Sequence, residues 1–371
     1  MSKPKIAIVH DWLTTMGGAE NVVLAMHEAF PDAPIYTSVY DRSAVPAFNN
    51  LDIRTTWLQK LPKPIRNLHK FFPILRIKAF RDLDLSDFDI ILSSSSAESK
   101  QVQKTRKNQI HICYCHTPIR YYWSHYSEYK KDPGFGKLNW IIRLLMPITV
   151  PALKKADYKA AQKIDVFIAN SDEVKNRIKK YYGKNSTVIH PPVDVSRFTP
   201  SIKRSNYYVA LGRQVPYKRI DLAVKAATAL DIPLKVFGNG SEHQKLVEMA
   251  GPSVQFYSDR FGDASDKAVT EALNSAKGYI FPAEEDFGIV QAEALASGTP
   301  VIAYAKGGAL DIVDDGESGV LFKHQKIESL TNAILKAESK KFLASTLHRK
   351  AKRFDKMLFI AKIKKVVSNY L

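Results

Sequence analysis

The sequence predicts an α/β protein built from two doubly wound domains, each a parallel sheet with helices on both faces. Short runs that are apolar throughout alternate with longer stretches of helical pattern, which is typical of parallel strands buried on both faces. This alternation stops after Pro191 and Pro192, and it resumes beyond a polar stretch at residues 201–206. The length of 371 residues also fits two domains.

Six apolar runs mark the strands expected in the first domain, which we place at residues 1–190. They lie at residues 5–13, 33–40, 87–96, 109–118, 163–172 and 187–194. Helical patterns occupy most of the chain between them, so the strands are expected to form a parallel sheet.

Six further runs mark the second domain, which we place at residues 195–350. They lie at residues 207–213, 232–240, 253–259, 277–285, 299–308 and 319–323. The final stretch, residues 354–371, has a helical pattern, and we expect it to pack back on the first domain. Ligands of doubly wound sheets bind beyond the carboxyl ends of the strands, so a central cleft faced by the two domains is the expected ligand site.

Composition excludes several classes of protein. Hydrophobic residues make up 45% of the chain and aromatic residues 11%, so the chain is not disordered. Cys113 and Cys115 are its two cysteines, too few for a disulfide scaffold or a thiolate metal cage. We therefore expect a reducing, cytoplasmic compartment. No apolar stretch reaches the ~20 residues that cross a bilayer, and the start of the chain predicts a strand rather than a signal peptide.

The net charge of +18 is distributed unevenly. Residues 1–190 hold 29 basic and 17 acidic residues, whereas residues 191–339 hold 16 and 19. From residue 340 onward, ten basic residues accompany Asp355 as the single acidic residue. The excess therefore lies in the first domain and the tail, where it needs an anionic partner.

The most informative stretch is residues 281–303, where an acidic turn follows a strand and Gly288 opens a helix. Glu293 lies in this helix among apolar residues, and an ionised carboxylate there needs a hydrogen-bonding partner such as a pair of ligand hydroxyls. Glu285 precedes it by eight residues, which is too far for the paired carboxylates of a double-displacement glycosidase. The two carboxylates are expected to hold one elongated ligand at two points.

The start of this helix is a candidate anion site. The first amides, at Gly288, Ile289 and Val290, lack acceptors within the helix and would bind a phosphate between the two carboxylates. The alternative is structural: the acidic turn caps the helix while Glu293 pairs with a nearby lysine.

A second candidate site is the loop after the strand at residues 207–213. It contains Arg213 and Lys218, and two cations at the carboxyl edge of a sheet suit a diphosphate, with arginine as a fork and lysine as a point charge. The alternative is a solvated loop with ordinary surface cations.

The first domain offers weaker signals. Gly17 and Gly18 follow the first strand and can bring backbone amides close to a phosphate at a helix start, although Gly-Gly is often simply a turn. His116 directly follows another strand, where it could donate to a sugar hydroxyl or stabilise a cationic transition state. A lone histidine is more often structural.

In this order, the motifs resemble the retaining glycosyltransferases of family four, which have the GT-B fold of two Rossmann-like domains. The resemblance covers essentially the whole chain: the Gly-Gly turn, H-x-P at His116, the G-R-x-x-x-x-K loop and above all E-x7-E from Glu285 to Glu293. The segments DWLTTMGGAE, YCHTPIRYYW and PAEEDFGIVQAEA look most similar to mannosyltransferase-like members that build bacterial surface polysaccharides and glycolipids.

The resemblance implies a role for each candidate residue. Glu293 would bind the ribose hydroxyls of a nucleotide sugar, and Glu285 would bind the transferred sugar. Arg213 and Lys218 would neutralise the diphosphate leaving group. Gly18 would approach the phosphate, and His116 would lie at the sugar.

The resemblance further implies transfer of mannose from GDP-mannose with retention, onto a lipid-linked or glycan acceptor. No carboxylate is placed as an obvious nucleophile, which disfavours a covalent route. Front-face departure of the nucleoside diphosphate is implied instead, with side-chain cations in place of a metal and no cofactor. The family usually has glycine where this chain has Asp286, which leaves the tightness of the turn and the donor sugar open. The alternative donor is a UDP-sugar.

Residues 57–81 predict contact with a membrane surface. They hold seven Lys or Arg and no acid, interleaved with Trp57, Phe71, Phe72 and other large apolar residues. Such segments suit docking on anionic lipid, so we expect peripheral attachment to the inner face of the cell membrane, helped by the basic tail. The alternative is that the aromatic residues belong to the core and the cations are solvated.

Two further classes of function compete with this interpretation. A nucleotide-sugar epimerase can share the two-domain fold, because fold alone does not define chemistry. A nucleic-acid-binding protein would explain the basic composition, but it would leave the two glutamates without a role. We therefore expect a nucleotide sugar, rather than a nucleic acid, as the partner.

Overall fold

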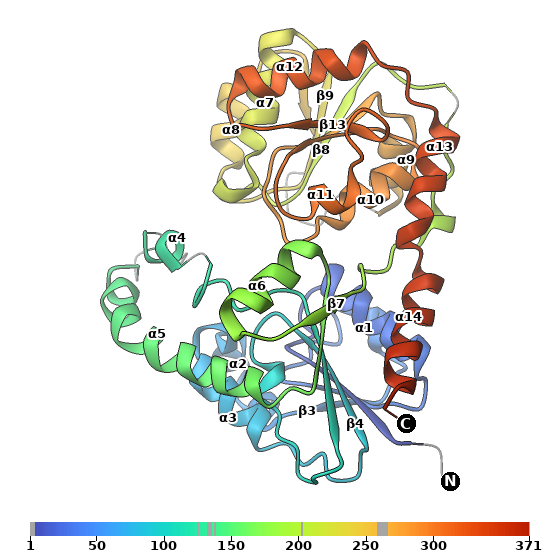
Figure 1. The fold of residues 1–371 in the computed structure, drawn as a ribbon. Helices are drawn as coiled ribbons and strands as arrows, with labels where there is room; N and C mark the ends of the chain where they lie inside the picture. Colours follow the sequence, from blue (N-terminus) through green and yellow to red (C-terminus); the bar gives the residue numbers. More distant parts are fainter. Residues whose placement is uncertain are drawn as a thin grey trace. The chain divides into compact units, whose positions relative to one another are not determined.

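The computed structural model of the protein describes residues 4–124, 126–131, 136, 139–201, 203–257 and 266–370. The chain forms two compact units (Figure 1). The first comprises Met1–Pro191 together with Phe359–Leu371, and the second comprises Pro192–Leu358. Each unit is an α/β layer structure around its own parallel sheet.

The first unit is built on a seven-stranded parallel sheet with the order β3-β2-β1-β4-β5-β6-β7. The strands are β1 (Ile6–His10), β2 (Ile35–Thr37), β3 (Ile53–Thr55), β4 (Ile90–Ser95), β5 (Ile110–Cys115), β6 (Val166–Ala169) and β7 (Ser186–Val188). Because β1, β4 and β5 are neighbours, the residues that follow them lie along one edge of the sheet.

Helices cover both faces of this sheet. They are α1 (Gly18–Ala29), α2 (Lys63–Asn67), α3 (Pro73–Arg81), α4 (Tyr126–Lys131), α5 (Asn139–Gln162), α6 (Asp172–Tyr182) and α14 (Lys356–Ser368). Side chains of α1 and α14 pack on one face, whereas α3 packs on the other near β1 and β4, and α5 and α6 pack there near β5 and β6. Short 3₁₀ turns include η2 (Trp57–Lys60), η3 (His69–Phe71) and η4 (Ser99–Gln101).

The second unit is built on a six-stranded parallel sheet with the order β10-β9-β8-β11-β12-β13. The strands are β8 (Tyr208–Leu211), β9 (Leu234–Phe237), β10 (Val254–Phe256), β11 (Gly278–Phe281), β12 (Val301–Tyr304) and β13 (Gly319–Phe322). The helices are α7 (Ile220–Leu230), α8 (His243–Met249), α9 (Asp266–Ser275), α10 (Ile289–Ala296), α11 (Ala309–Ile312), α12 (Ile327–Glu338) and α13 (Ala344–Ala351). Apolar clusters fill both faces, with α7, α8 and α12 on one and α9, α10, α11 and α13 on the other.

The structure confirms the predicted fold class, and a strand lies wholly or partly in each of the twelve expected runs. Residues 258 and 259 of one run lie outside the described residues. The sequence reasoning missed β3, a strand of three residues at the edge of the first sheet. Its central Arg54 is exposed and pairs with Asp52, so the strand has no apolar run that would reveal it.

The two cysteines lie on one face of β5, and both are fully buried. They pack in an apolar cluster with Ala161, Phe167 and Ile178. Burial raises the pKa of the Cys113 thiol to about 12. Cys113 is therefore an inert core residue.

The basic tail is divided between the units. Seven of its ten cations precede Phe359 and belong to the second unit, while Lys362, Lys364 and Lys365 belong to the first. In the second unit, Lys350 and Arg353 pair with Asp314. The tail therefore does not contribute all its charge to the first unit, and part of that charge is already neutralised.

Candidate functional site

The loops after β8 and β11 meet because these two strands are neighbours in the second sheet. The loop after β8 contains a 3₁₀ turn, η7 (Pro216–Lys218), and Lys218 ends that turn. Its Nζ forms an ion pair with Oε1 of Glu285, in the loop after β11. Both side chains are 18% exposed, so the pair is largely withdrawn from solvent and its charges are weakly screened.

Arg213 lies on the same loop as Lys218 and is exposed. Its Nη2 donates to the hydroxyl of Tyr217 at 2.5 Å, and the Lys218 ammonium lies 5.7 Å from the centre of the same ring. The two predicted diphosphate cations are thus gathered around one tyrosine, with Glu285 as the anion that balances Lys218.

A buried glutamine fixes this loop. Gln214 donates to the carbonyl of Gly238 at 2.5 Å, and its Oε1 lies 2.6 Å from Nδ1 of His243. An amide oxygen is an acceptor, so His243 must donate from Nδ1. Arg213, which precedes Gln214 in the sequence, therefore extends from a backbone that these hydrogen bonds fix.

The loop that carries Glu285 is held by a Gly-Gly turn after β12. The amide of Gly308 donates to the carbonyl of Glu285 at 2.9 Å, and Gly307 approaches the same carbonyl with φ of +62°. A Cβ on either glycine would collide with the backbone of Glu285 or Phe287. Sequence reasoning missed this role, although Lys306-Gly307-Gly308 ends the run at residues 299–308 that predicted a strand.

The helix α10 begins as predicted, after Gly288 with φ of +83°, a left-handed conformation that favours glycine. Ile289 and Val290 form its first turn. Their amides point out of the helix start, where backbone donors and the helix dipole favour an anion.

Glu293 projects from the second turn of α10 and has a partner that the sequence did not indicate. Its Oε1 accepts from Nη2 of Arg197 at 3.2 Å, and the Arg197 guanidinium also lies over the ring of Phe198 at 4.8 Å. Arginine, rather than the lysine considered above, supplies the cation. The two residues are 96 positions apart, so no local sequence signal could have paired them.

A second set of predicted residues lies in the first unit, at the carboxyl edge of β1, β4 and β5. His116 follows β5, and its Nε2 lies 2.8 Å from the hydroxyl of Ser94 on β4. Nδ1 of His10, at the end of β1, lies 3.2 Å from both the hydroxyl and the carbonyl of Ser94. Nε2 of His10 lies 3.5 Å from Glu20 in α1. The side chains of Glu20, His10, Ser94 and His116 therefore form a continuous series of polar contacts.

The surroundings of His10 favour its charged form. Burial lowers the pKa of His10, but hydrogen bonding and charge from Glu20 outweigh it, and the pKa is raised overall. Asp11 beside it accepts from the amides of Ser96, Ala97 and Ser99. Although burial opposes ionisation of Asp11, the nearby His10 charge and these amides lower its pKa.

The turn of Gly17 and Gly18 lies where the sequence predicted it, between β1 and α1. Gly17 caps α1 in an extended conformation, and Gly18 is the first helical residue. A Cβ on Gly17 would lie 3.1 Å from Oε2 of Glu20, so the glycine leaves room for the carboxylate that reaches His10. The contact between His10 and Glu20 has a sequence signal, which is H-D at the end of β1 and G-G-A-E at the start of α1. His10 and Glu20 were not among the predicted site residues.

The structure thus gathers the predicted residues into two groups. The second unit brings together Arg213, Lys218, Glu285 and the start of α10, and Glu293 lies one turn further along that helix. The first unit connects His116, through Ser94 and His10, to Glu20 in the first turn of the helix that Gly17 caps. Among the described residues, no group of three or more His, Cys, Asp or Glu is arranged to hold a metal ion.

Each of the two units matches a known protein family. Residues 16–197 match the family described as Glycosyltransferase Family 4, and residues 194–354 match that described as Glycosyl transferases group 1. The crystal structure of Anabaena HepE in complex with UDP-glucose aligns with a TM-score of 0.70 at 16% identity, covering 99% of this chain and all of that one. The two family models together cover residues 16–354 and place the chain among the glycosyltransferases, and its fold is GT-B.

Curated relatives agree with this class. A D-inositol 3-phosphate glycosyltransferase of Geodermatophilus obscurus is 32% identical over 187 residues, covering 42% of each chain. A GDP-mannose-dependent α-(1-6)-phosphatidylinositol monomannoside mannosyltransferase of Mycolicibacterium smegmatis is 27% identical over 220 residues, covering 51% of this chain and 56% of the relative. The chain belongs to glycosyltransferase family four, and mannosyltransferases are among its relatives.

The matched regions span about half the length of these curated relatives. Within the described residues, no helix is both long enough and apolar enough to cross a bilayer.

Proposed function

We propose that this glycosyltransferase moves mannose from GDP-mannose, with retention of configuration, onto a lipid-linked or glycan acceptor. The ion pair between Lys218 and Glu285 carries the proposal. It places a cation suited to a diphosphate against a carboxylate suited to sugar hydroxyls, on two loops that follow neighbouring strands.

The pair also suggests how donor binding is driven. Without donor, Glu285 balances the charge of Lys218. A diphosphate would supply a stronger anionic partner for Lys218 and would release the carboxylate to accept hydrogen bonds from the hexose. Donor binding thus replaces one largely buried pairing by two, so neither charge is left without a partner.

The same exchange is available at Glu293. Arg197 holds this carboxylate now, and its own side chain is 41% exposed. Ribose hydroxyls that donate to Glu293 would share its carboxylate with Arg197 or displace Arg197, whose side chain can turn to solvent. The first amides of α10, one turn earlier on the same helix, would then receive the diphosphate.

In the proposed reaction, the bond between the sugar's anomeric carbon and the diphosphate oxygen breaks while the acceptor oxygen bonds to that carbon from the same face. The proton of the acceptor hydroxyl passes to the departing phosphate. Arg213, Lys218 and the start of α10 would stabilise the charge that develops on the leaving group, which removes the need for a metal. His116 would donate a hydrogen bond to the sugar.

A UDP-sugar is the second candidate donor. The solved HepE structure contains UDP-glucose, and the mannosyltransferase relative named above depends on GDP-mannose. The diphosphate chemistry described here would serve both donors, so the choice depends on the base and the sugar.

Nucleotide release tests the proposal. The full chain is mixed separately with GDP-mannose, UDP-glucose and UDP-GlcNAc, with and without a chelator and a lipid extract as acceptor, and free nucleotide is measured. We expect release with GDP-mannose, increased by acceptor and unchanged by the chelator. Turnover with UDP-sugars alone would overturn the assignment of the donor. Conversion of the donor sugar without acceptor would indicate an epimerase instead.

We also propose peripheral attachment to an anionic membrane through residues 57–81. The structure modifies the prediction in two ways. Arg76 is buried and paired with Glu98, and Phe80 belongs to the core, so neither can contact lipid. Phe71, Phe72, Ile74 and Leu75 remain exposed, as do Lys60 and Lys63, while the side chain of Lys70 lies outside the described part.

A further inference from the structure

The first half of α5 has apolar residues on both sides. Met146, Val150 and Leu153 face the core. Trp140, Leu144 and Ile148 recur every fourth residue and are 67%, 67% and 73% exposed, so they form a stripe on one side of the helix. A surface helix ordinarily has polar residues at such positions.

The neighbouring helix α3 has a similar outer side. Its inner side is anchored by Arg76, whose Nε donates to Glu98 at 2.7 Å, and by Ile77 and Phe80, which are buried. Ile74 on the other side is 62% exposed. This exposure therefore belongs to a firmly packed helix rather than to a loose segment.

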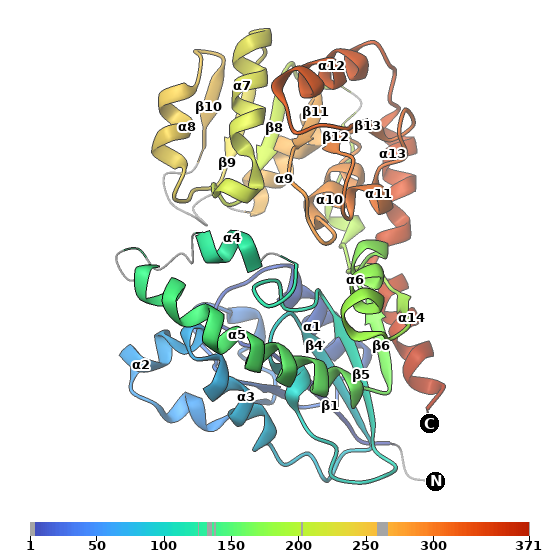
Figure 2. The same cartoon turned by 60° about the vertical axis from the view of Figure 1, so that its left-hand side comes forward.

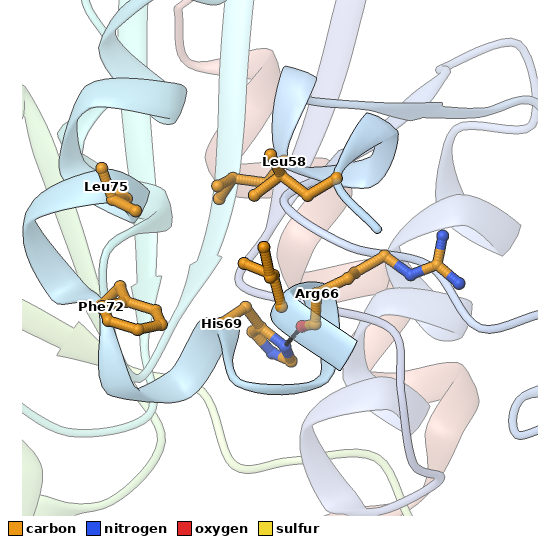
Figure 3. A pocket seen from close by; sticks show the side chains of 7 residues that line it. Leu58, Arg66, His69, Phe72 and Leu75 are labelled. Atoms are coloured by element: carbon orange, nitrogen blue, oxygen red, sulfur yellow. Dashed lines mark hydrogen bonds between the residues drawn. The ribbon is translucent and has the colours of Figure 1, made fainter. Parts of the chain in front are cut away.

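The two apolar sides belong to adjacent helices. Ile77 of α3 packs in one cluster with Met146 and Val150 of α5, and Figure 2 shows α5 running beside α2 and α3. Between η2, α2 and α3 lies a small apolar pocket lined in part by Leu58, Phe72 and Leu75, with the Arg66 guanidinium extending away from it (Figure 3).

Positive charge surrounds this apolar surface. Neither residues 57–81 nor residues 139–156 contain an aspartate or glutamate. Exposed cations accompany both helices: Lys60, Lys63, Lys78, Arg81, Arg143, Lys154, Lys155 and Lys159. Lys78 is paired with Asp82, and Asp157, the first acid along α5, is buried against Lys100. The surface thus combines exposed apolar side chains with a positive border.

We infer that the outer sides of α3 and α5 together insert into an anionic lipid surface, with the α5 stripe as the inserting element. Large apolar side chains would enter the boundary between headgroups and acyl chains, and the cations would bind lipid phosphates. A second copy of this chain would present the same positive border and be repelled, whereas an anionic bilayer is complementary in both respects. The inference extends the membrane attachment proposed above by adding α5, which the sequence reasoning did not include.

Vesicle binding tests the inference. The full chain is sedimented with vesicles of phosphatidylcholine alone and of phosphatidylcholine mixed with phosphatidylglycerol. The variant Trp140→Ser/Leu144→Ser/Ile148→Ser is compared with Leu310→Ser/Leu335→Ser/Leu343→Ser, whose original side chains are 58%, 51% and 56% exposed in the second unit. We expect the α5 variant to lose about tenfold or more in partitioning to the anionic vesicles, and the control to bind as the parent does.

Insertion itself has a separate readout. The native cysteines are fully buried, so an environment-sensitive dye attached to Leu144→Cys reports from α5. We expect a blue shift on anionic vesicles and quenching by a lipid-borne quencher. Unshifted emission with vesicle binding intact would overturn insertion by α5 and leave attachment by charge through residues 57–81.

Two further outcomes separate the proposals. Failure of the parent protein to bind any vesicle would overturn both membrane proposals without affecting the donor, because nucleotide release is also measured in the absence of lipid. A parent dimer that the α5 variant converts to a monomer, without vesicle binding, would assign the surface to self-association and overturn the inference. Nucleotide release from the donor at the parental rate would show that the α5 variant is folded.

Discussion

The hydroxyl of Ser94 lies 2.8 Å from Nε2 of His116 and joins that histidine to the buried pair of His10 and Glu20. His10 carries a raised pKa. When it is charged, its Nδ1 donates to Ser94, so the hydroxyl proton of Ser94 is free to point at His116. Nε2 of His116 then accepts, and its remaining proton lies on Nδ1.

Removal of this hydroxyl should therefore impair turnover more than stability. We expect Ser94→Ala to lower kcat about tenfold and to shift its pH profile, because the tautomer of His116 is no longer fixed. Ser93→Ala is the matched control, since Ser93 makes the same kind of bond to His111, also at 2.8 Å. Equal losses in both variants would reduce Ser94 to a structural residue.

The cations of the second unit should be essential for release of the diphosphate. We expect Lys218→Ala to lower nucleotide release by about a hundredfold or more, because charge on the leaving group loses one of its proposed cations. Lys225→Ala removes a lysine whose side chain is 41% exposed and which pairs with Asp221, and it should be nearly neutral. Near-parental rates in a folded Lys218→Ala protein would indicate that the loop is an ordinary solvated surface.

Glu293 should affect binding of the nucleotide portion of the donor. We expect Glu293→Gln to weaken donor and free GDP alike, since ribose hydroxyls would lose a charged acceptor. Arg197→Ala should weaken them less or leave them unchanged, because donor binding is proposed to displace that arginine. Isothermal titration with GDP measures both, and undiminished GDP affinity in Glu293→Gln would contradict the assignment.

The glycine that supports Glu285 can be tested against a glycine of similar backbone conformation. Gly307 has φ of +62° and Gly183 has φ of +70°, but a Cβ would meet the Glu285 carbonyl at the first and nothing within 4 Å at the second. Each Gly→Ala change costs about 1 kcal/mol in backbone strain. We expect Gly307→Ala alone to weaken donor binding as well, because it displaces the Glu285 loop.

The pair of His10 and Glu20 should make stability depend on pH. A folded-state pKa that is raised stabilises the protein below the unfolded value of about 6.5, and the stabilisation is lost as pH rises through the folded pKa. Glu20→Gln removes the largest of the contributions that raise the His10 pKa, ahead of Asp11 and Ser94. Urea unfolding should therefore show a larger loss of stability at about pH 5.5 than at about pH 8.5, by about 1.4 kcal/mol per pKa unit removed.

His111 provides an internal contrast with the opposite sign. Burial lowers its pKa to about 4, so it stabilises the fold above about pH 6.5 and this contribution is lost as pH falls through the folded pKa. It is present in both proteins and cancels in the comparison of Glu20→Gln with the parent. A loss of stability that is equal at both pH values would contradict the charged state of His10.

The sequence revealed features that are local. Buried parallel strands are apolar throughout, so twelve of them could be recognised, whereas β3 is short and contains an exposed arginine. The motif from Glu285 to Glu293 spans a single turn and helix start, so its spacing is visible in the chain. Pairings such as Glu293 with Arg197, or Ser94 with His116, depend on strand order and on long-range packing.

The basic segment shows a different limit. Sequence alone assigned all seven cations of residues 57–81 to a surface, and the structure buries one of them, Arg76, against Glu98. Composition reports how many charges a segment has, but not which side of a helix they occupy. In α5, likewise, the sequence does not indicate that the apolar residues Trp140, Leu144 and Ile148 face outward.

The chain passes from the first unit to the second after Pro191 and returns after Leu358. Phe359, Ile360 and Ile363 of α14 complete an apolar core whose other members come from α1, from strands of the first sheet and from loops of the first unit. A ribosome therefore has to synthesise the whole second unit before the first can finish folding. The order of synthesis is not the order of completion, and a nascent chain that ended at residue 191 would expose the part of its core that α14 covers.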